Sequence, residues 1–484
     1  MIKNKTLCFL LVASFFISST TISFGSNPTT TKIDKDTQTN LEISSIDANW
    51  TVMFYLCCEN HISYEAERKI QGLSEIGSSS DLNIIALKDG NQDNDSILYY
   101  IEKNNPMNLN QAYDWPDEVD MGDPNTLSSF IELVKENYPA KNYALYILSD
   151  MGSGWQGICH DTRNPNNGLP LMSFPTFSNV LKTTTNDEDD KLDVIIFNPC
   201  VVGMFEVAYE LSPNVDYMVA SEEHMLEELD KGPEYVTQYK QTIWNLKNNT
   251  DMNPEEFAIS FVDNYNSCDF PMWALYSYMI LMKKGDYSHF VAKLSNFLTK
   301  LFNSLPNSEF HFIEIKTTLS AINLSKMKEL GGSIGNLSSV LLLNQDDEDT
   351  LNAVSNARKN VREYGKFYTK DKNLLYYLNF PLEKNAFDSF VDLYDLVYLL
   401  NDSSSRQTVK HACRKVMSAF EESIIANSAM PDDSSYGLSI YFPKSYELYN
   451  KYLWEDEITY KYEDLNFSKN SLWDEFLNSY LGTK

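Results

Sequence analysis

The sequence is poor in basic residues. Its 484 residues include 39 Lys and Arg against 68 Asp and Glu, which gives a formal net charge of −29. Nucleic acids and anionic membranes repel such a surface, so we expect neither as the main partner. The charge is typical of a highly soluble protein, and a basic protein partner is the alternative interpretation.

The sequence also lacks a hydrophobic run long enough to span a bilayer, which takes roughly 18 or more apolar residues. The apolar run from Leu7 to Ile17 is too short for this. Two lysines precede it, and Ser23 and Gly25 follow it with the small side chains that a signal peptidase accepts. We therefore predict a signal peptide over residues 1–26 and a secreted, extracellular protein without a membrane span.

Cysteine is scarce, with seven residues in total, of which Cys8 lies in the predicted signal peptide. The remaining six permit disulfides in an exported protein, but a chain of this length does not need them for stability. We expect mostly buried thiols and leave the pairing open. Cys57 and Cys58 are neighbours on a predicted strand, so alternation places their side chains on opposite faces.

The recurrent spacings of metal sites are missing as well. No cluster of His, Cys and Asp has the spacing of a structural zinc site. The acidic run 187–190 lacks the glycine and the ligand spacing of a calcium loop and is typical of a solvated linker. We expect neither a metal nor another cofactor.

What the sequence does contain is enough apolar material for a large core. Hydrophobic residues make up 43% of the chain and aromatic residues 13%, which excludes disorder over most of its length. Residues 27–48 are polar and predict a flexible leader. We divide the rest into an α/β core over 49–240 and a helix-rich C-terminal region over 241–484.

Strands and helices alternate through the predicted core. Apolar runs of strand length lie at 51–57, 82–87, 96–101, 143–148, 194–197 and 217–220. Helical patterns lie at 63–76, at 126–138 with Asp123 or Asn125 as N-cap, and later at 290–302, 390–400 and 472–481. A late strand is expected within 437–443. Buried strands separated by helices predict a doubly wound, mostly parallel sheet with helices on both faces.

In such a sheet, ligand-binding and catalytic residues lie beyond the carboxyl ends of the strands. Here these positions are the loops 149–161 and 198–202. Cys200 follows a buried strand and stands just before a predicted helix, whose N-terminus would favour a thiolate and hold an oxyanion. A buried structural cysteine is the other interpretation. The glycines of the first loop permit close approach of a ligand, and a tight structural turn would look the same.

Several segments, in the same order along nearly all of residues 50–481, resemble the clostripain family of cysteine peptidases. They are Trp50 to Met53, Asp120 to Pro124, Asn198 to Cys200, Gly203-Met204, Glu206 to Leu211, Ala220 to Glu223, Leu319 to Ile322 and Gly437 to Pro443. The resemblance implies a caspase-like fold with a His–Cys dyad at adjacent strand ends and a polypeptide substrate.

Carried over by position, Cys200 takes the place of the family's nucleophile. The family's His-Gly-Ser-Gly-Trp corresponds to the run from Met151 to Trp155, so Met151 stands where the general base belongs. Methionine has no titratable group and cannot accept this proton. The resemblance also makes the amide of Gly152 the candidate oxyanion donor. Asn198 replaces the family's acidic residue that faces a basic P1 side chain, and a neutral amide loses that charge partner.

Other residues could take over the role of the missing histidine or of the missing acidic residue. His160 is the candidate substitute base, although a solvated loop histidine explains it equally. Asp150 adjoins Met151 but has the position of a residue that caps a turn. Asp230 lies near a second acidic substrate-binding position of the family, in a loop that aligns poorly. For His224 we expect a surface position.

Two functions from different classes follow. The first is a catalytically inactive or strongly impaired peptidase homologue, a pseudoenzyme that acts as a binding or scaffold protein. The second is an active cysteine endopeptidase with a relocated base and an altered P1 preference. A different acyl-transfer enzyme that uses Cys200 is a third, narrower alternative.

Overall fold

The structure is a computed structural model, and it describes residues 48–59, 62–149, 154–159, 161, 171–184, 191–223, 238–265, 269–271, 314–365, 389–449 and 461–482. All of these residues belong to one compact unit, Asp47–Lys484.

The centre of this unit is a nine-stranded sheet in the order β12-β10-β7-β6-β5-β1-β2-β3-β4. Its strands are β1 (Ala48–Cys57), β2 (Leu82–Asp89), β3 (Ile97–Glu102), β4 (Asn105–Asn108), β5 (Ala140–Ser149), β6 (Leu192–Phe197), β7 (Val215–Ala220), β10 (Leu319–Asn323) and β12 (Ile424–Ser428). The five central strands, from β7 to β2, are parallel, and the strands at both edges pair antiparallel. The mostly parallel, doubly wound sheet expected from the sequence is confirmed.

The central strands are apolar along most of their length because both faces of the sheet are covered. β6, for example, buries every residue except Asp193, which is half-buried. Each of the six apolar runs predicted as a strand coincides with one strand of this sheet. The neighbours Cys57 and Cys58 pack into the cores on opposite faces, as alternation predicts.

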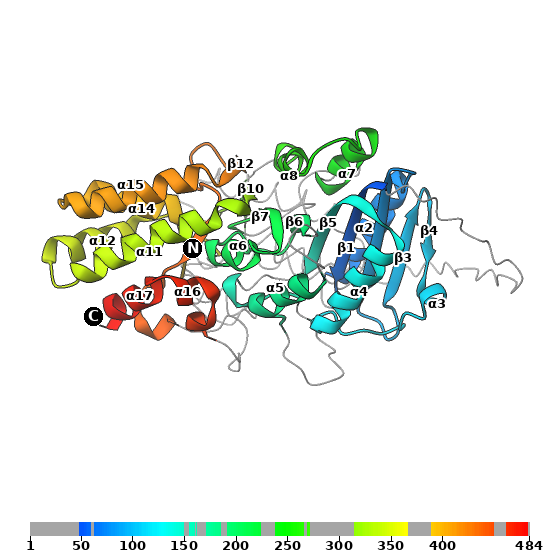
Figure 1. The fold of residues 1–484 in the computed structure, drawn as a ribbon, viewed down its shortest axis with the longest axis horizontal. Helices are drawn as coiled ribbons and strands as arrows, with labels where there is room; N and C mark the ends of the chain where they lie inside the picture. Colours follow the sequence, from blue (N-terminus) through cyan, green and yellow to red (C-terminus); the bar gives the residue numbers. More distant parts are fainter. Residues whose placement is uncertain are drawn as a thin grey trace, which may run out of the picture. The chain divides into compact units, whose positions relative to one another are not determined.

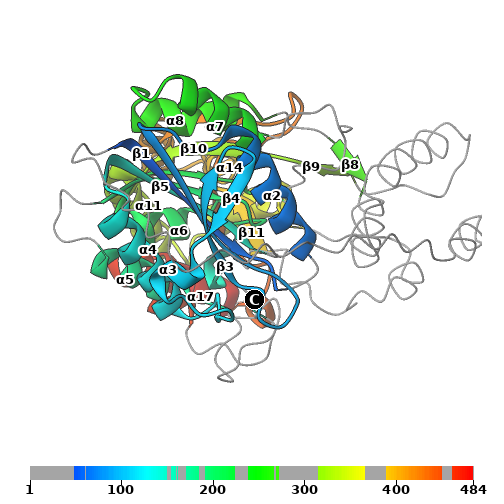
Figure 2. The same ribbon diagram turned by 90° about the vertical axis from the view of Figure 1, so that its right-hand side faces the viewer.

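Helices cover both faces of the sheet, and Figure 2 shows two of the groups on opposite sides of the strands. One face packs against α2 (Ser63–Ile76), α7 (Gln238–Asn248) and α8 (Pro254–Asp263). The other packs against α4 (Pro124–Asn137), α5 (Phe174–Thr183) and α6 (Phe205–Leu211). Asp123 is the N-cap of α4, where its carboxylate accepts a hydrogen bond from the Asn125 amide at 2.8 Å, so the first of the two predicted caps is confirmed.

Further helices from the second half of the chain extend the core on the α6 side (Figure 1). They are α11 (Met327–Leu343), α12 (Glu348–Asn360), α14 (Leu393–Ser403), α15 (Gln407–Glu421), α16 (Asn466–Asn470) and α17 (Trp473–Gly482). α11 packs against both α15 and α17. The helix expected at 290–302 lies outside the described residues. Across the described part of the chain, no helix has the length and apolar character needed to cross a bilayer.

Two further strand pairs stand apart from the large sheet: β8 (Asp269–Pro271) with β9 (Glu314–Lys316), and β11 (Phe390–Asp392) with β13 (Ser439–Tyr441). β13 is the late strand expected within 437–443. The helix expected over 390–400 was wrong at its start, because its first three residues form β11 and the helix α14 begins at Leu393. Pairing with β13 outweighs the local helical pattern there.

Candidate active site

The two loops singled out by the sequence follow the neighbouring parallel strands β5 and β6. In the first of these loops Gly154, which has a φ of +59°, lies against residues that come after the second loop in sequence. A Cβ added there would lie 2.9 Å from the Met204 Sδ and 2.6 Å from the Phe390 Cζ. Only glycine fits this approach without rearrangement, so Gly154 packs against Met204 at the start of α6 and against Phe390.

Trp155 anchors the end of that run. Its indole is fully buried, with ring centroids 5.5 Å from Tyr441 and 5.2 Å from Tyr462 in edge-on arrangements. Such aromatic contacts add to the burial of a large apolar area. Further along the loop, the Cys159 amide donates to the Ser149 Oγ at 3.1 Å, which holds the far side of the loop against the end of β5.

Cys200 lies on a turn between β6 and α6. The Asn198 amide donates to the Ile147 carbonyl at 2.9 Å, so this turn continues the β5–β6 pairing for one more residue. Cys200 is partly exposed, and Val201, with φ of +52°, takes the chain out of any helical path. Helix α6 therefore begins only at Phe205. Cys200 therefore does not stand just before the helix as expected: residues 201–204 separate it from the first residue of α6.

The backbone of the neighbouring strand end holds this turn instead. The Val201 amide donates to the Glu223 carbonyl at 3.2 Å, and the Gly203 amide donates to the Ser221 carbonyl at 2.7 Å. A Cβ on Gly203 would lie 2.6 Å from the Ser221 carbonyl carbon, so the close approach requires glycine. From the other side, the Ser439 amide donates to the Gly203 carbonyl at 2.9 Å.

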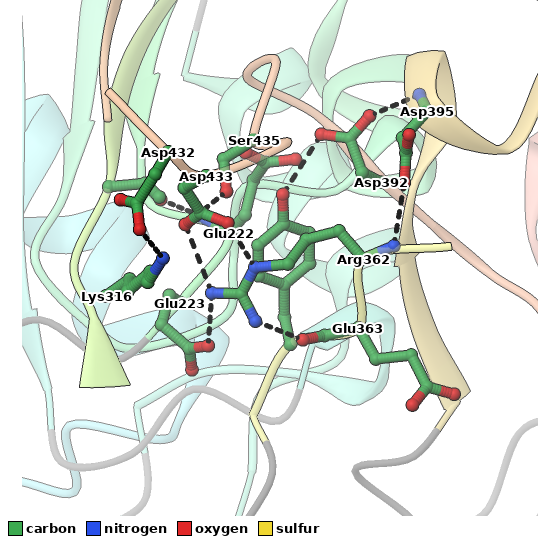
Figure 3. Close-up of polar contacts among 12 residues, drawn as sticks. Glu222, Glu223, Lys316, Arg362, Glu363, Asp392, Asp395, Asp432, Asp433 and Ser435 are labelled. Carbon is green, nitrogen blue, oxygen red and sulfur yellow. Dashed lines mark hydrogen bonds and ion pairs between the residues drawn. The ribbon is translucent and has the colours of Figure 1, made fainter. Parts of the chain in front are cut away.

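The segment Ser221–Glu223 is in turn fixed by a buried ion network, shown in Figure 3. The Glu223 carboxylate accepts hydrogen bonds from the Gly365 amide at 2.9 Å and from the Arg362 Nη2 at 3.4 Å. The same guanidinium donates its Nε–H to the Asp433 Oδ1 at 2.7 Å. Arg362 thus joins two buried carboxylates from distant parts of the chain, a geometry that its planar fork suits.

Glu222 points to the other side of this network. Burial, together with the adjacent Asp392 carboxylate, raises the pKa of Glu222 well above its usual range. The Gly437 amide donates to the Glu222 Oε2 at 3.1 Å, and the Tyr364 hydroxyl donates to the Asp392 Oδ2 at 3.0 Å. Burial also raises the pKa of Asp392, to about 7. Both carboxyl groups are thus biased toward their protonated forms, because burial disfavours the charged form of each.

Another buried carboxyl group lies on α6. Glu206 is fully buried, and it accepts hydrogen bonds from the Tyr441 amide at 2.8 Å and from the Tyr462 hydroxyl at 2.7 Å. Burial raises the pKa of Glu206 to about 7. This residue connects the helix behind Cys200 to the C-terminal region.

Of the residues singled out from the sequence, Cys200 and Asn198 lie together on the turn after β6. Met151, Gly152, His160, Asp230, Asp150 and His224 lie outside the described residues. Sequence reasoning missed the roles of Glu222 and Glu223. The available signal was a pair of adjacent glutamates directly after a buried strand, where two acidic side chains need partners from elsewhere in the chain.

The arrangement offers a partly exposed thiol on a rigid turn at the carboxyl ends of parallel strands. Cys57, Cys58, Cys159 and Cys413 are thiols too, but all four are buried. Among the described cysteines, Cys200 is thus the one with access to solvent, which nucleophilic attack on a substrate requires.

Comparisons with known proteins agree with this geometry. A model of the clostripain family matches residues 54–480. Clostripain from Hathewaya histolytica is 28% identical over 265 residues, which make up 46% of this chain and 49% of that protein. The chain thus spans about half the length of the curated relative that it matches.

Two solved structures share the fold. A secreted C11 cysteine protease from Bacteroides thetaiotaomicron, in complex with an irreversible peptide inhibitor, is 15% identical with a TM-score of 0.54, covering 88% of this chain and all of that one. An inactive zymogen C11 protease from Parabacteroides distasonis is 15% identical with a TM-score of 0.54, covering 88% of this chain and 99% of that one. These likenesses establish the caspase-like fold. The family model covers nearly the whole described sheet and the helices beyond it. This match identifies the chain as a member of the clostripain family of cysteine peptidases.

Proposed function

We propose that this protein is a secreted member of the clostripain family whose peptidase activity is absent or strongly impaired and which acts as a binding or scaffold protein. The observation that carries the proposal is Met151, at the family's histidine position in a run whose spacing to Gly152 and Trp155 is intact. A cysteine peptidase needs a base near the thiol to take and return the proton. A thioether cannot do this.

Three further observations support this function. Gly154 packs against Met204, four residues after Cys200, so the described end of the Met151–Trp155 run lies near the segment that follows Cys200 in sequence. Asn198 gives the substrate-binding position a neutral amide. The start of α6 at Phe205 also means that Cys200 is not part of the first turn of that helix, where the helix dipole acts most strongly on a thiol. Export is supported by the N-terminal sequence and by the relative from Bacteroides thetaiotaomicron, which is described as secreted.

Restoring the base tests the proposal. We expect Met151→His, and more strongly Met151→His combined with Asn198→Asp, to cleave Arg- or Lys-containing fluorogenic peptides, while the wild type gives little or no cleavage. A positioned acid–base group contributes about 10²–10⁴-fold, so a gain of this order is expected. The matched control is the restored variant with Cys200→Ala, which should be inactive.

The second function makes a different prediction in the same assay. Robust peptide cleavage by the wild type, abolished by Cys200→Ala, would contradict the proposal that the protein is a pseudoenzyme. If His160→Ala also abolished it, His160 would be the relocated base. A peptide library then defines the P1 preference, and a sharp selection for Arg or Lys would point to Asp230 as the charge partner in place of Asn198.

A further inference from the structure

Two cysteines other than Cys200 lie at the carboxyl-end edge of the sheet. Cys57 is the last residue of β1, and Cys159 lies in the loop after β5. Both are thiols, both are fully buried, and both belong to the core on the face of the sheet that α4, α5 and α6 cover. Cys58 packs into the core on the opposite face. Alternation along the chain therefore places Cys57 on the face of Cys159 and Cys58 on the other.

Ser149, at the end of β5, connects the backbones around the two cysteines. It is the register partner of Cys57 in the parallel pairing of β1 with β5, so these two residues lie side by side on neighbouring strands. The Ser149 Oγ accepts a hydrogen bond from the Cys159 amide at 3.1 Å. The loop after β5 thus returns to the strand end from which it started and brings Cys159 to the end of β1.

The backbone of Cys159 is held in an uncommon conformation. Its φ of +60° is costly for a residue with a Cβ, so surrounding contacts must maintain it. Directly before it, Ile158 exchanges two backbone hydrogen bonds with Met172, at 2.9 Å and 2.8 Å. A Cβ added to Gly122 would lie 3.1 Å from the Cys159 carbonyl oxygen, so the turn before α4 packs closely against this residue. Contacts with three other segments therefore determine where Cys159 lies.

The two thiols lie within reach of each other. A hydrogen bond with Cys159, together with burial, raises the pKa of the Cys57 thiol well above its usual range. Burial also raises the pKa of Tyr55, and the nearby Cys159 and Cys57 raise it further. Thiols at hydrogen-bond distance need only a rotation and a small approach of their side chains to form an S–S bond, which is about 2.05 Å long.

We propose that Cys57 and Cys159 form a disulfide bond when the chain folds in an oxidising environment. Secreted proteins fold and persist in such environments, so the export proposed above would supply this condition. A small-molecule disulfide serves as the oxidant. One cysteine thiolate attacks it and releases one small thiol, and the second thiolate attacks the resulting mixed disulfide and releases the other. The two cysteines thereby lose two electrons and two protons, which the two released thiols carry away.

Burial determines when this bond forms. Both thiols are shielded from solvent in the folded protein, so an oxidant reaches them during folding or local opening. The bond joins residues 102 positions apart (159 − 57), and it would restrict the unfolded chain over that length. It would also tie the loop that contains Met151 to the end of β1. The proposal holds whether or not the protein cleaves peptides.

The test is refolding of the reduced full chain with oxidised glutathione, compared with refolding in dithiothreitol. Remaining thiols are then blocked, and mass spectrometry of a proteolytic digest identifies the linked peptides. We expect one dominant link, between the peptide that contains Cys57 and the peptide that contains Cys159. The oxidised protein should melt several degrees above the reduced protein, because the bond restricts the unfolded chain. Oxidation in concentrated urea should give this link only as a minor product.

Cys58→Ala is the matched control, because it removes a buried thiol of the same segment that packs on the other face of the sheet. It also assigns the link, since Cys57 and Cys58 share one peptide. This variant should keep the link and the difference in melting temperature between its oxidised and reduced forms. Cys57→Ala and Cys159→Ala should lose both. Each variant is compared with its own reduced form, so a general loss of packing does not affect the result.

Three outcomes would overturn the proposal. The first is the absence of a link between Cys57 and Cys159 after refolding with oxidised glutathione. The second is a dominant link from Cys58 or Cys200 to Cys159. The third is an equal yield of the Cys57–Cys159 link after oxidation in urea, which would show that the fold does not bring these thiols together.

Discussion

Single residues in this protein bury carboxyl groups at positions where the chain folds back on itself. Glu206 is one example, because its carboxyl group lies at the end of a short helix and receives donors from two residues more than 200 positions later. One of its oxygens, Oε2, has no hydrogen-bond partner within the described part of the protein. The folded state therefore favours the protonated form of Glu206, and this preference makes stability depend on pH.

The sign of the dependence follows from the raised pKa of about 7. Between about pH 4.5, where an unfolded glutamate titrates, and about pH 7, the folded state binds more protons, so stability falls as pH rises. The shift corresponds to roughly 3 kcal/mol across this window. We expect Glu206→Gln to remove this loss, so that its stability relative to the wild type increases by that order between pH 5 and pH 8. Urea denaturation of both proteins at each pH measures the difference. Replacing the exposed Glu132 by Gln is the control. A stability difference between Glu206→Gln and the wild type that does not change with pH would contradict the argument.

At the scale of elements, the candidate site depends on connections between strand ends rather than on any one loop. The end of β7 holds the Cys200 turn through two backbone hydrogen bonds. The ion network around Arg362 then joins the end of β7 to the segments after α12 and before β13. The position of Cys200 is thus coupled to residues that the helix-rich half of the chain contributes.

Removing the guanidinium should expose this coupling. In Arg362→Ala the Glu223 and Asp433 side chains, which are 6% and 3% exposed, lose their shared positive partner. Breaking a buried ion pair on one side costs about 3–5 kcal/mol, so we expect a loss of that size in the free energy of unfolding. Arg406→Ala is the matched control, because Arg406 pairs with Asp347 at the surface, and its loss should be much smaller. Equal losses in the two variants would contradict a special role for Arg362.

At the scale of the whole molecule, the sequence was informative about what is local. Apolar runs located the central strands, and Asp123 was one of two N-cap candidates because its acceptor and the donor that it binds lie two residues apart. Contacts between distant residues were not predictable. Glu223 and Arg362 are 139 residues apart in sequence, and no local pattern indicates that they pair. The positive φ of Val201, which delays α6, likewise depends on the backbone of β7 and not on the residue type.

The nine-stranded sheet draws β10 and β12 from beyond residue 240. A chain that ends at residue 240 would leave β7 as an uncovered edge and Trp155 without Tyr441 and Tyr462. We expect this fragment to lack a cooperative unfolding transition and near-ultraviolet circular dichroism, and co-expression with residues 241–484 to restore both. A cooperative transition of the fragment alone would instead make residues 49–240 an independent domain.

The hydrogen bond between Tyr462 and Glu206 spans 256 residues and belongs to the core behind the candidate site. A chain emerging from the ribosome cannot close this core until Tyr462 has been synthesised. The nascent polypeptide therefore stays open through most of its synthesis. For a protein exported as we propose, this delay keeps the chain in the unfolded state that a translocation channel can thread. In that case the same delay would postpone completion of the Cys200 site until after export.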